Sequence, residues 1–535
     1  MVTETDPRVA SGNITIQQLL REVLNKSARP QNSIEIAAIL ESFGWNDERA
    51  ASTFGAEDVF ELADQLWTMA GDGLQRETYA REKKRSLGER FRVIAQSFIR
   101  GLIFALPMAV SVAAMLTLRL SLWSYYSFNV EIATSIAIGT ILSFVAVGGF
   151  TQAIARRGFF YLSQGFYNMG RRITFYLVRV GYVASALVGV CYLLTNLFYR
   201  NFTIEMMLIT VLYYAFLCSN WLSITIMYIL RKEFHFAAMI TVGIAIVAVL
   251  FYVVGLNIIL SQVIALSVLS VVDFLLADYF FREAERKEER GIAPPMPKRS
   301  VMIYTVRPYF LYGLLYFVFI FLDRVLAWSS NSQFSMPYMI WFRGDYELGL
   351  DFALLMLLLP MGLSEIVVSN LMRRLEITQK NAYSKETDSL RSKYIRAYIK
   401  SMVLIAAGAV ISAVLIIWFV WFLQRTNLGD ISKVYQFSSV TYFVFYVALF
   451  GYAVLSVALA NAVILFSISQ PGKSNWSIGI ALLVDFLVGF AASRWFGYYD
   501  AVVGMAVGSV VFLILTTYQV SRVLRRLNYY IYATL

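Results

Sequence analysis

Long uninterrupted runs of apolar residues recur along this chain between Phe98 and Val520. Roughly 30 Å of hydrocarbon, at about 1.5 Å rise per residue, needs about 20 residues of α-helix, so each run is long enough to span a bilayer. The runs are continuous in Leu, Ile, Val and Phe, whereas a membrane β-barrel alternates apolar and polar residues. The pattern therefore predicts an all-α membrane protein with about twelve transmembrane helices. The predicted spans are Phe98–Trp123, Ile132–Ile154, Thr174–Leu197, Thr203–Leu230, Phe236–Val254, Ile258–Phe281, Met302–Trp328, Leu348–Met372, Ser401–Leu423, Val434–Phe466, Trp476–Phe496 and Ala501–Val520.

A different pattern precedes the first span. Residues 14–28, 33–43 and 56–70 carry apolar residues at helical spacing, and Asn46-Asp47-Glu48 is typical of a helix N-cap with an acidic first turn. Residues 1–72 hold five Lys/Arg and twelve Asp/Glu, a net charge of −7, while the whole chain has a net charge of +11. We therefore expect a small soluble helical domain at residues 1–75, which serves either as a folding appendage or as a docking module.

The spans fall into two groups of six. The charged segment from Arg282 to Arg299, which is rich in proline, lies between the sixth and seventh spans. Transporters commonly consist of two such repeated halves. A short match, R-x-x-x-W-S, begins at Arg119 and again at Arg324, near the ends of the first and seventh spans. The expected domains are the soluble domain at 1–75, a basic juxtamembrane linker at 76–97, a first half at 98–281, a cytoplasmic linker at 282–301 and a second half at 302–535.

Basic residues mark one side of the membrane. Seven Lys/Arg lie between Arg76 and Arg92, directly before the first span, and the loops that follow the even-numbered spans are also basic. Since positively charged loops stay in the cytoplasm, both termini are expected there, in a multi-pass bacterial inner-membrane protein whose basic clusters contact anionic membrane lipids. The first apolar run begins almost a hundred residues into the chain, so no cleavable signal peptide is expected. This placement explains the pI of 9.4 without a nucleic acid partner.

Composition and motifs argue against an enzyme. The chain is 59% hydrophobic and 15% charged, with one histidine and two cysteines. It contains no phosphate-binding G-x-x-x-x-G-K-[ST], no H-E-x-x-H, no G-x-S-x-G and no paired-cysteine metal motif. We expect neither a catalytic site nor a cofactor nor a bound metal.

Charged residues within the apolar spans are the candidate functional residues, because a charge at the centre of a membrane helix costs about 2.5–3.5 kcal/mol. Glu365 and Asp485 lie well inside their spans and, with Asp273, are candidates for coupling transport to an ion. The candidates for the substrate path are Arg119, Arg179, Arg307, Asp323, Arg324 and Asp351. Several of these lie within about two turns of a predicted helix boundary, and their side chains could instead reach the membrane interface. Pro107 and Pro360, each inside a span, predict kinks that are either hinges or static.

The seventh span carries a family resemblance. The segments Arg307-Pro-Tyr-Phe-Leu-Tyr-Gly-Leu-Leu-Tyr316 and Phe321-Leu-Asp-Arg-Val-Leu-Ala-Trp328 resemble the Pel exopolysaccharide exporter family. That family is similar to the multidrug/oligosaccharidyl-lipid/polysaccharide flippase superfamily, whose members have two six-helix halves around a central cavity. The resemblance implies that a polysaccharide or lipid-linked saccharide passes between the halves, with Asp323 and Arg324 near the outer mouth.

The leading hypothesis is thus a saccharide exporter or flippase that works by alternating access. Cationic side chains such as Arg119 and Arg324 could hold anionic sugars or a pyrophosphate link through charge-assisted hydrogen bonds. A small-molecule drug/cation antiporter is one alternative. Another is a non-transporting membrane scaffold of a polysaccharide synthase complex, in which the acidic N-terminal domain docks a cytoplasmic glycosyltransferase.

Overall fold

The computed structural model describes residues 15–26, 30, 32–73, 87–103, 106–288, 296–330, 338–380, 387–425 and 437–532. Within these ranges the chain is helical and holds no strand, apart from an isolated bridge between Leu120 and Tyr125. The all-α prediction is therefore confirmed. Contacts divide the chain into two compact units: residues 1–95 together with 370–398, and residues 96–369 together with 399–535.

Four short helices form a small N-terminal bundle in the first unit. They are α1 (Ile16–Lys26), α2 (Ser33–Ser42), α3 (Asp47–Phe54) and α4 (Val59–Gly73). The Asn46 side chain accepts a hydrogen bond from the Arg49 backbone N–H at 2.9 Å, so the predicted N-cap is present. Leu19, Leu40 and Leu62 are fully buried in one apolar core, which gives this acidic segment a hydrophobic interior of its own.

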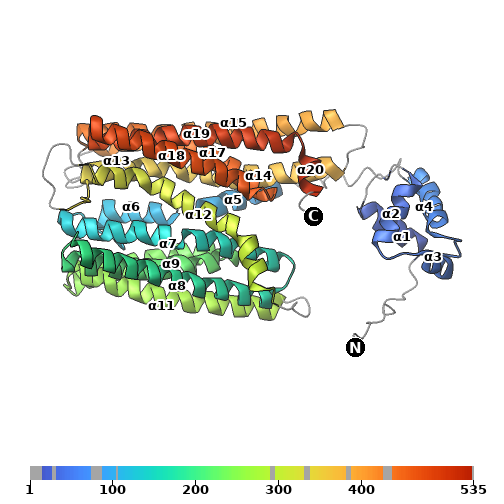
Figure 1. The fold of residues 1–535 in the computed structure, drawn as a ribbon, viewed down its shortest axis with the longest axis horizontal. Helices are drawn as coiled ribbons and strands as arrows, with labels where there is room; N and C mark the ends of the chain where they lie inside the picture. The colour runs from blue at the N-terminus through green and yellow to red at the C-terminus, as the bar shows by residue number, and fades with distance from the viewer. Residues whose placement is uncertain are drawn as a thin grey trace. The chain divides into compact units, whose positions relative to one another are not determined.

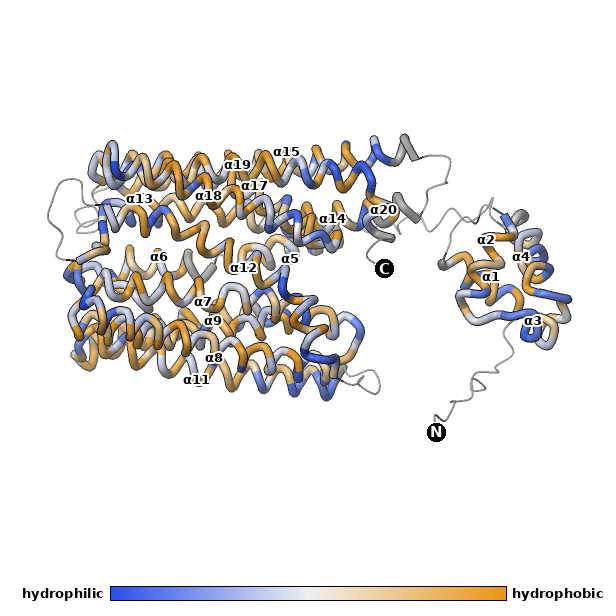
Figure 2. Tube along the Cα trace, viewed as in Figure 1, coloured by the Kyte–Doolittle hydropathy of each residue, from blue (hydrophilic) through white to orange (hydrophobic). Residues whose placement is uncertain are grey.

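Eleven helices of the described residues are long and apolar enough to cross a membrane. Hydrophobic residues run along these helices, and hydrophilic residues gather towards their ends (Figure 2). The helices of the membrane region are α5 (Leu87–Ile103), α6 (Leu106–Leu118), α7 (Val130–Ser163), α8 (Tyr167–Tyr199), α9 (Ile204–Ile229), α10 (Glu233–Ala248), α11 (Ile258–Glu288), α12 (Arg299–Trp328), α13 (Gly344–Leu354), α14 (Leu358–Lys380), α15 (Thr387–Arg425), α17 (Ser439–Ser467), α18 (Pro471–Trp495), α19 (Ala501–Leu524) and the short α20 (Leu527–Tyr532).

The membrane helices pack around two separate hydrophobic cores. One core takes its buried residues from positions 114–302, and the other takes them from positions 312–512. Figure 1 shows α7, α8, α9 and α11 together on one side of α12, with α13, α17, α18 and α19 on the other. The buried residues change from one core to the other between Met302 and Tyr312, near the expected boundary between the halves, and the division into six and six stays a prediction. The linker boundaries at 76–97 and 282–301 stay predictions, because residues 74–86 and 289–295 lie outside the described part of the chain.

The first predicted span, Phe98–Trp123, comprises the end of α5 and all of α6, which ends at Leu118. Residues 104 and 105 lie outside the described part of the chain, so the prediction of one spanning helix here stays a prediction. Arg119 follows the end of α6 with a positive φ of 58°. It therefore lies in a turn, whereas Arg324 lies within α12, and the two R-x-x-x-W-S segments do not have equivalent local structures.

The eighth span breaks where proline predicts it. A 3-10 turn, Leu355–Leu357, separates α13 from α14 just before Pro360. Proline has no N–H, so the Met356 carbonyl four residues earlier loses its helical partner. The buried Ser412 hydroxyl of α15 donates to that carbonyl at 2.6 Å and replaces the missing hydrogen bond. The kink is thus stabilised by a neighbouring helix.

Candidate functional site

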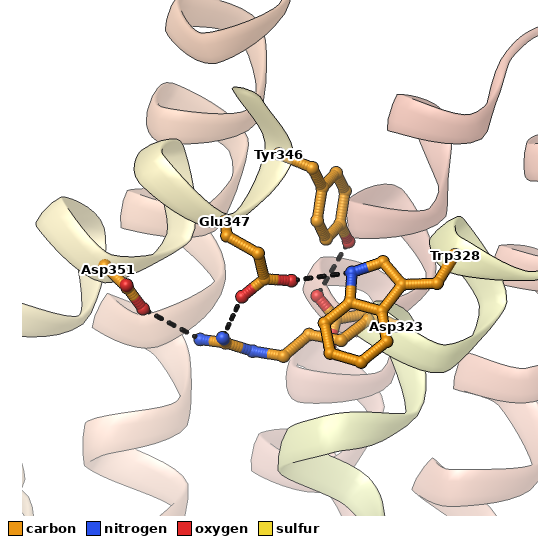
Figure 3. A network of polar contacts seen from close by, with 6 residues as sticks. Asp323, Trp328, Tyr346, Glu347 and Asp351 are labelled. Atoms are coloured by element: carbon orange, nitrogen blue, oxygen red, sulfur yellow. Dashed lines mark hydrogen bonds and ion pairs between the residues drawn. The ribbon is translucent and has the colours of Figure 1, made fainter. Parts of the chain in front are cut away.

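A polar cluster lies where α12 ends and α13 begins (Figure 3). Its centre is Arg324, whose side chain is only 10% exposed. The guanidinium forms an ion pair with Glu347 and a second, at 3.3 Å between Nη2 and Oδ1, with Asp351. Trp328 donates from its indole nitrogen to the other oxygen of Glu347 at 2.9 Å. The structure therefore brings two predicted path residues, Arg324 and Asp351, into direct contact.

Asp323 precedes Arg324 on α12 and projects about 100° away from it around the helix. Its carboxylate accepts a hydrogen bond from the Tyr346 hydroxyl at 2.8 Å, and the second carboxylate oxygen has no hydrogen-bond partner among the described residues. Asp485 of α18 lies within electrostatic range of Asp323 and is fully buried. Neither of its carboxylate oxygens has a hydrogen-bond partner in the described structure. The two acidic side chains thus form a second, incompletely satisfied part of the cluster.

The charges of this cluster do not balance. Asp323, Glu347 and Asp485 are three buried carboxyls, and the one buried cation among them is Arg324. An unpaired charge in a low-dielectric environment costs several kcal/mol, so buried acidic groups need a proton or a bound cation when no basic side chain pairs with them. The arrangement can therefore take up positive charge.

Hydrogen bonds hold the end of α12 in place. Arg494, in the last turn of α18, donates to the backbone carbonyls of Leu326 at 2.8 Å and Ser329 at 3.2 Å. Arg343 donates to the Ser330 carbonyl at 3.1 Å. The last carbonyls of a helix lack partners within the helix and attract cations, so the two arginines stabilise this terminus. They fix the position from which Arg324 and Trp328 project.

Close helix packing also positions Asp485. Gly504 and Gly508 of α19 face it so closely that an added Cβ would lie 2.6 Å from the Asp485 carbonyl oxygen and 2.8 Å from its Cβ, respectively. Small residues allow membrane helices to approach in this way. The packing leaves no room for the carboxyl to move towards α19.

The other predicted residues lie elsewhere. Asp273 of α11 is buried in the first half, and the structure does not join it to the cluster. Arg179, Arg307 and Glu365 are exposed on their helices, and Arg119 lies over the Tyr126 ring at 5.4 Å. Among the described residues no group of three or more His, Cys, Asp or Glu could hold a metal ion. The candidate list thus separates into one cluster and several isolated positions.

Two cluster residues escaped the sequence interpretation. Glu347 precedes the predicted start of the eighth span at Leu348, so it counted as a loop residue, but α13 begins at Gly344 and buries it. Tyr346 carries no charge and gave no signal. An acidic pair in the first turn of a helix, Asp345 and Glu347, was the sequence feature that could have extended the helix to include them.

The two halves meet along two helix pairs. Gly148 of α7 and Gly313 of α12 let these backbones cross: a Cβ on Gly313 would lie 2.2 Å from the Gly148 carbonyl oxygen. On the other pair, a Cβ on Gly101 of α5 would lie 2.6 Å from the Met361 carbonyl oxygen of α14. These pairs join the second span to the seventh and the first to the eighth. If the two halves are repeats, these two pairs are equivalent: in each, the first span of one half contacts the second span of the other half.

Comparisons with known proteins give similarity in fold. No family model matches the sequence, and no curated protein matches it. Three solved structures resemble the chain: a mutant of a Vibrio cholerae MATE transporter (12% identity, 82% of this chain and 97% of that chain, TM-score 0.53), MATE in complex with MaD5 (12%, 81% and 97%, 0.52) and MATE in complex with MaL6 (14%, 81% and 97%, 0.51). These neighbours are transporters rather than enzymes. The chain therefore has the fold of MATE transporters.

Proposed function

We propose that this protein is a membrane transporter that moves a polysaccharide or lipid-linked saccharide across the bilayer by alternating access. The observation that carries the transport part is the MATE-like fold, which covers most of the chain and has two halves with separate hydrophobic cores. Alternating access needs two bodies that rock against each other. Separate cores allow each half to move as a body.

The saccharide part rests on the resemblance of the seventh span to the Pel exopolysaccharide exporters. The geometry changes the expected role of Arg324 in that proposal. Its guanidinium is already paired with Glu347 and Asp351, so it does not offer a free cation to an anionic sugar or a pyrophosphate. The cluster instead carries excess negative charge, and we propose that it serves ion coupling rather than cargo binding.

Asp485 is the residue that we assign to coupling, together with Asp323. A proton or a sodium ion at this pair would neutralise charge that no described side chain balances. Transport by the Asp485→Asn variant in proteoliposomes should lose its dependence on an imposed ion gradient. Glu365→Gln is the matched control, because Glu365 is exposed and should leave that dependence unchanged. Wild-type gradient dependence in Asp485→Asn would remove the pair from the mechanism.

Deletion of the gene in its host tests which class of molecule the protein transports. We expect loss of surface polysaccharide, with normal sensitivity to cationic dyes. Dye accumulation in the deletion strain with unchanged surface polysaccharide would point to the drug/cation antiporter. A scaffold would co-purify with a cytoplasmic glycosyltransferase and show no transport in proteoliposomes.

The membrane placement is part of the proposal. We propose an inner-membrane location with both termini in the cytoplasm, where the basic loops contact anionic lipids and the N-terminal bundle docks a glycosyltransferase. Reporter fusions to either terminus should be active only as cytoplasmic reporters. A periplasmic signal from either fusion would reverse the predicted orientation.

A further inference from the structure

A row of aromatic side chains connects the two halves. Along α12 it lies between Gly313, where α12 crosses α7, and Arg324 in the polar cluster. Phe144 of α7 stacks on Trp221 of α9 at 4.4 Å between ring centroids. Phe144 also stacks on Phe317 at 5.2 Å and on Phe321 at 5.4 Å, both from α12. Trp123 meets Trp221 edge-on at 6.3 Å and extends the row within the first half. We refer to these five residues as the aromatic row.

The residues of the aromatic row lie at the edge of the hydrophobic cores. All five are partly exposed, and Trp123, Trp221 and Phe321 pack against the two cores, whereas Phe319 on another face of α12 is fully buried against Phe512. The indole nitrogen of Trp221 donates to the Ser143 hydroxyl of α7 at 3.2 Å, so this side chain faces α7. Phe144, Phe317 and Phe321, which meet at the seam between α7 and α12, each keep some accessible surface.

Polar groups border this surface. The Arg324 guanidinium lies 5.7 Å from the Phe321 ring, and its partner Asp351 has a side chain that is 55% exposed. Asp351 lies two turns inside a spanning helix, where a carboxylate facing lipid would be expensive. The exposed side of Asp351 therefore contacts water, in the seam or at the membrane interface, and Arg324 links this carboxylate to the Phe321 end of the aromatic row.

Aromatic faces next to hydrogen-bonding groups match one class of cargo closely. A pyranose ring presents a flat face of C–H groups, which packs on an aromatic ring, and a rim of hydroxyls, which requires donors and acceptors. Gln152 lies on α7 two turns from Phe144, against Gly313, and is a polar residue near the other end of the row. A row of several rings suits successive sugars of a chain.

We infer that the aromatic row is a saccharide-binding track, on which sugar rings stack in place of the rings that meet across the seam. This inference rests on the proposed saccharide transport and names the surface that performs it. Phe144 belongs to one half, and Phe317 and Phe321 belong to the other. Separation of the halves exposes their faces to a sugar, and closure of the seam covers them again.

The test measures binding of neutral oligosaccharides to the purified full-length protein in lipid nanodiscs. The probes are cellohexaose, maltohexaose and chitohexaose, followed by calorimetry. Phe317→Leu keeps most of the apolar volume but removes a ring face, while Trp221→Leu also removes volume and the indole N–H that donates to Ser143; each should weaken binding about three- to tenfold. Phe317→Tyr keeps the ring and should bind like the wild type.

Phe486→Leu is the matched control. Phe486 and Phe490 form a stacked pair at 5.7 Å on α18, and both are exposed, but neither belongs to the aromatic row. This variant should bind like the wild type. The inference is overturned when none of the three probes binds the wild type, or when Phe317→Leu and Phe486→Leu bind equally well.

The same variants separate this inference from the proposed function. Loss of surface polysaccharide on deletion, combined with normal export by Phe317→Leu and Trp221→Leu, would leave the transporter and remove the track. Unchanged surface polysaccharide on deletion would instead contradict the proposed saccharide transport itself, even if the oligosaccharides bind the purified protein.

Discussion

Substitution of Gly313 by alanine tests the crossing of α7 and α12. An added Cβ would lie 2.2 Å from the Gly148 carbonyl oxygen and 2.9 Å from its carbonyl carbon. Both are backbone atoms, which cannot rotate out of the way as a flexible side chain can. Ordinary van der Waals contact begins at 3.4 Å, so the two backbones would have to separate by about 1 Å.

The expected effect is a loss of stability. Overpacking in a close interface typically costs about 1–3 kcal/mol. The better helix propensity of alanine offsets up to about 1 kcal/mol of this loss. The Gly313→Ala protein should therefore unfold at a lower temperature than the wild type in the same detergent, and it should also favour states in which the seam has opened.

Gly479→Ala is the matched control for this substitution. Gly479 lies inside α18, and an added Cβ would have nothing within 4 Å. The Gly479→Ala protein gains the same helix propensity without a steric clash, so its unfolding temperature should equal or exceed that of the wild type. If Gly313→Ala is as stable as Gly479→Ala, the halves do not approach as closely as the structure shows, and the argument for a glycine crossing fails.

Three smaller perturbations probe individual hydrogen bonds. Ser412→Ala should destabilise the protein by about 1 kcal/mol, because the Met356 carbonyl then loses its donor, and an unfolding temperature equal to that of the wild type would contradict this account. Trp328→Phe removes the donor to the buried Glu347 carboxylate and should cost about 1–3 kcal/mol in the same assay, with no change expected if water replaces the indole. Asn46→Ala should cost about 1 kcal/mol locally, seen as faster hydrogen exchange in the N-terminal bundle, and unchanged exchange would mean that the cap contributes nothing.

The sequence predicted the fold well because membrane spanning is a local property. Each apolar run between Phe98 and Val520 carries its own evidence for a helix, since the bilayer sets its length and composition. The proline at 360 also signalled a break that the structure contains. The first span was harder to predict, because apolar composition continues through the end of α6 and does not mark where the helix stops.

The candidate site was only partly predictable because its contacts are long-range. Asp323, Arg324, Asp351 and Asp485 stood out as charges in apolar segments, but no spacing along the chain indicated that α13 and α18 would bring two of them, Asp351 and Asp485, to α12. The ion pairs of Arg324 could not be predicted for the same reason: its acidic partners lie 23 and 27 residues away. The close contact between Gly148 and Gly313 could likewise not be predicted, because it depends on how α7 and α12 cross.

The position of α12 links the three features that define this protein. One continuous helix carries Gly313 at the crossing, Phe317 in the aromatic row and Arg324 in the charge cluster, with its end fixed by Arg494. A change of charge at the cluster that favours one arrangement of α12 must therefore also shift the seam with α7. Under the proposed function the reverse holds by linkage: a cargo that opens the seam would change the affinity of the cluster for a cation by the same factor. The proposed coupling between cargo and ion would then need no relay of side chains, because both proposed sites lie on the same helix.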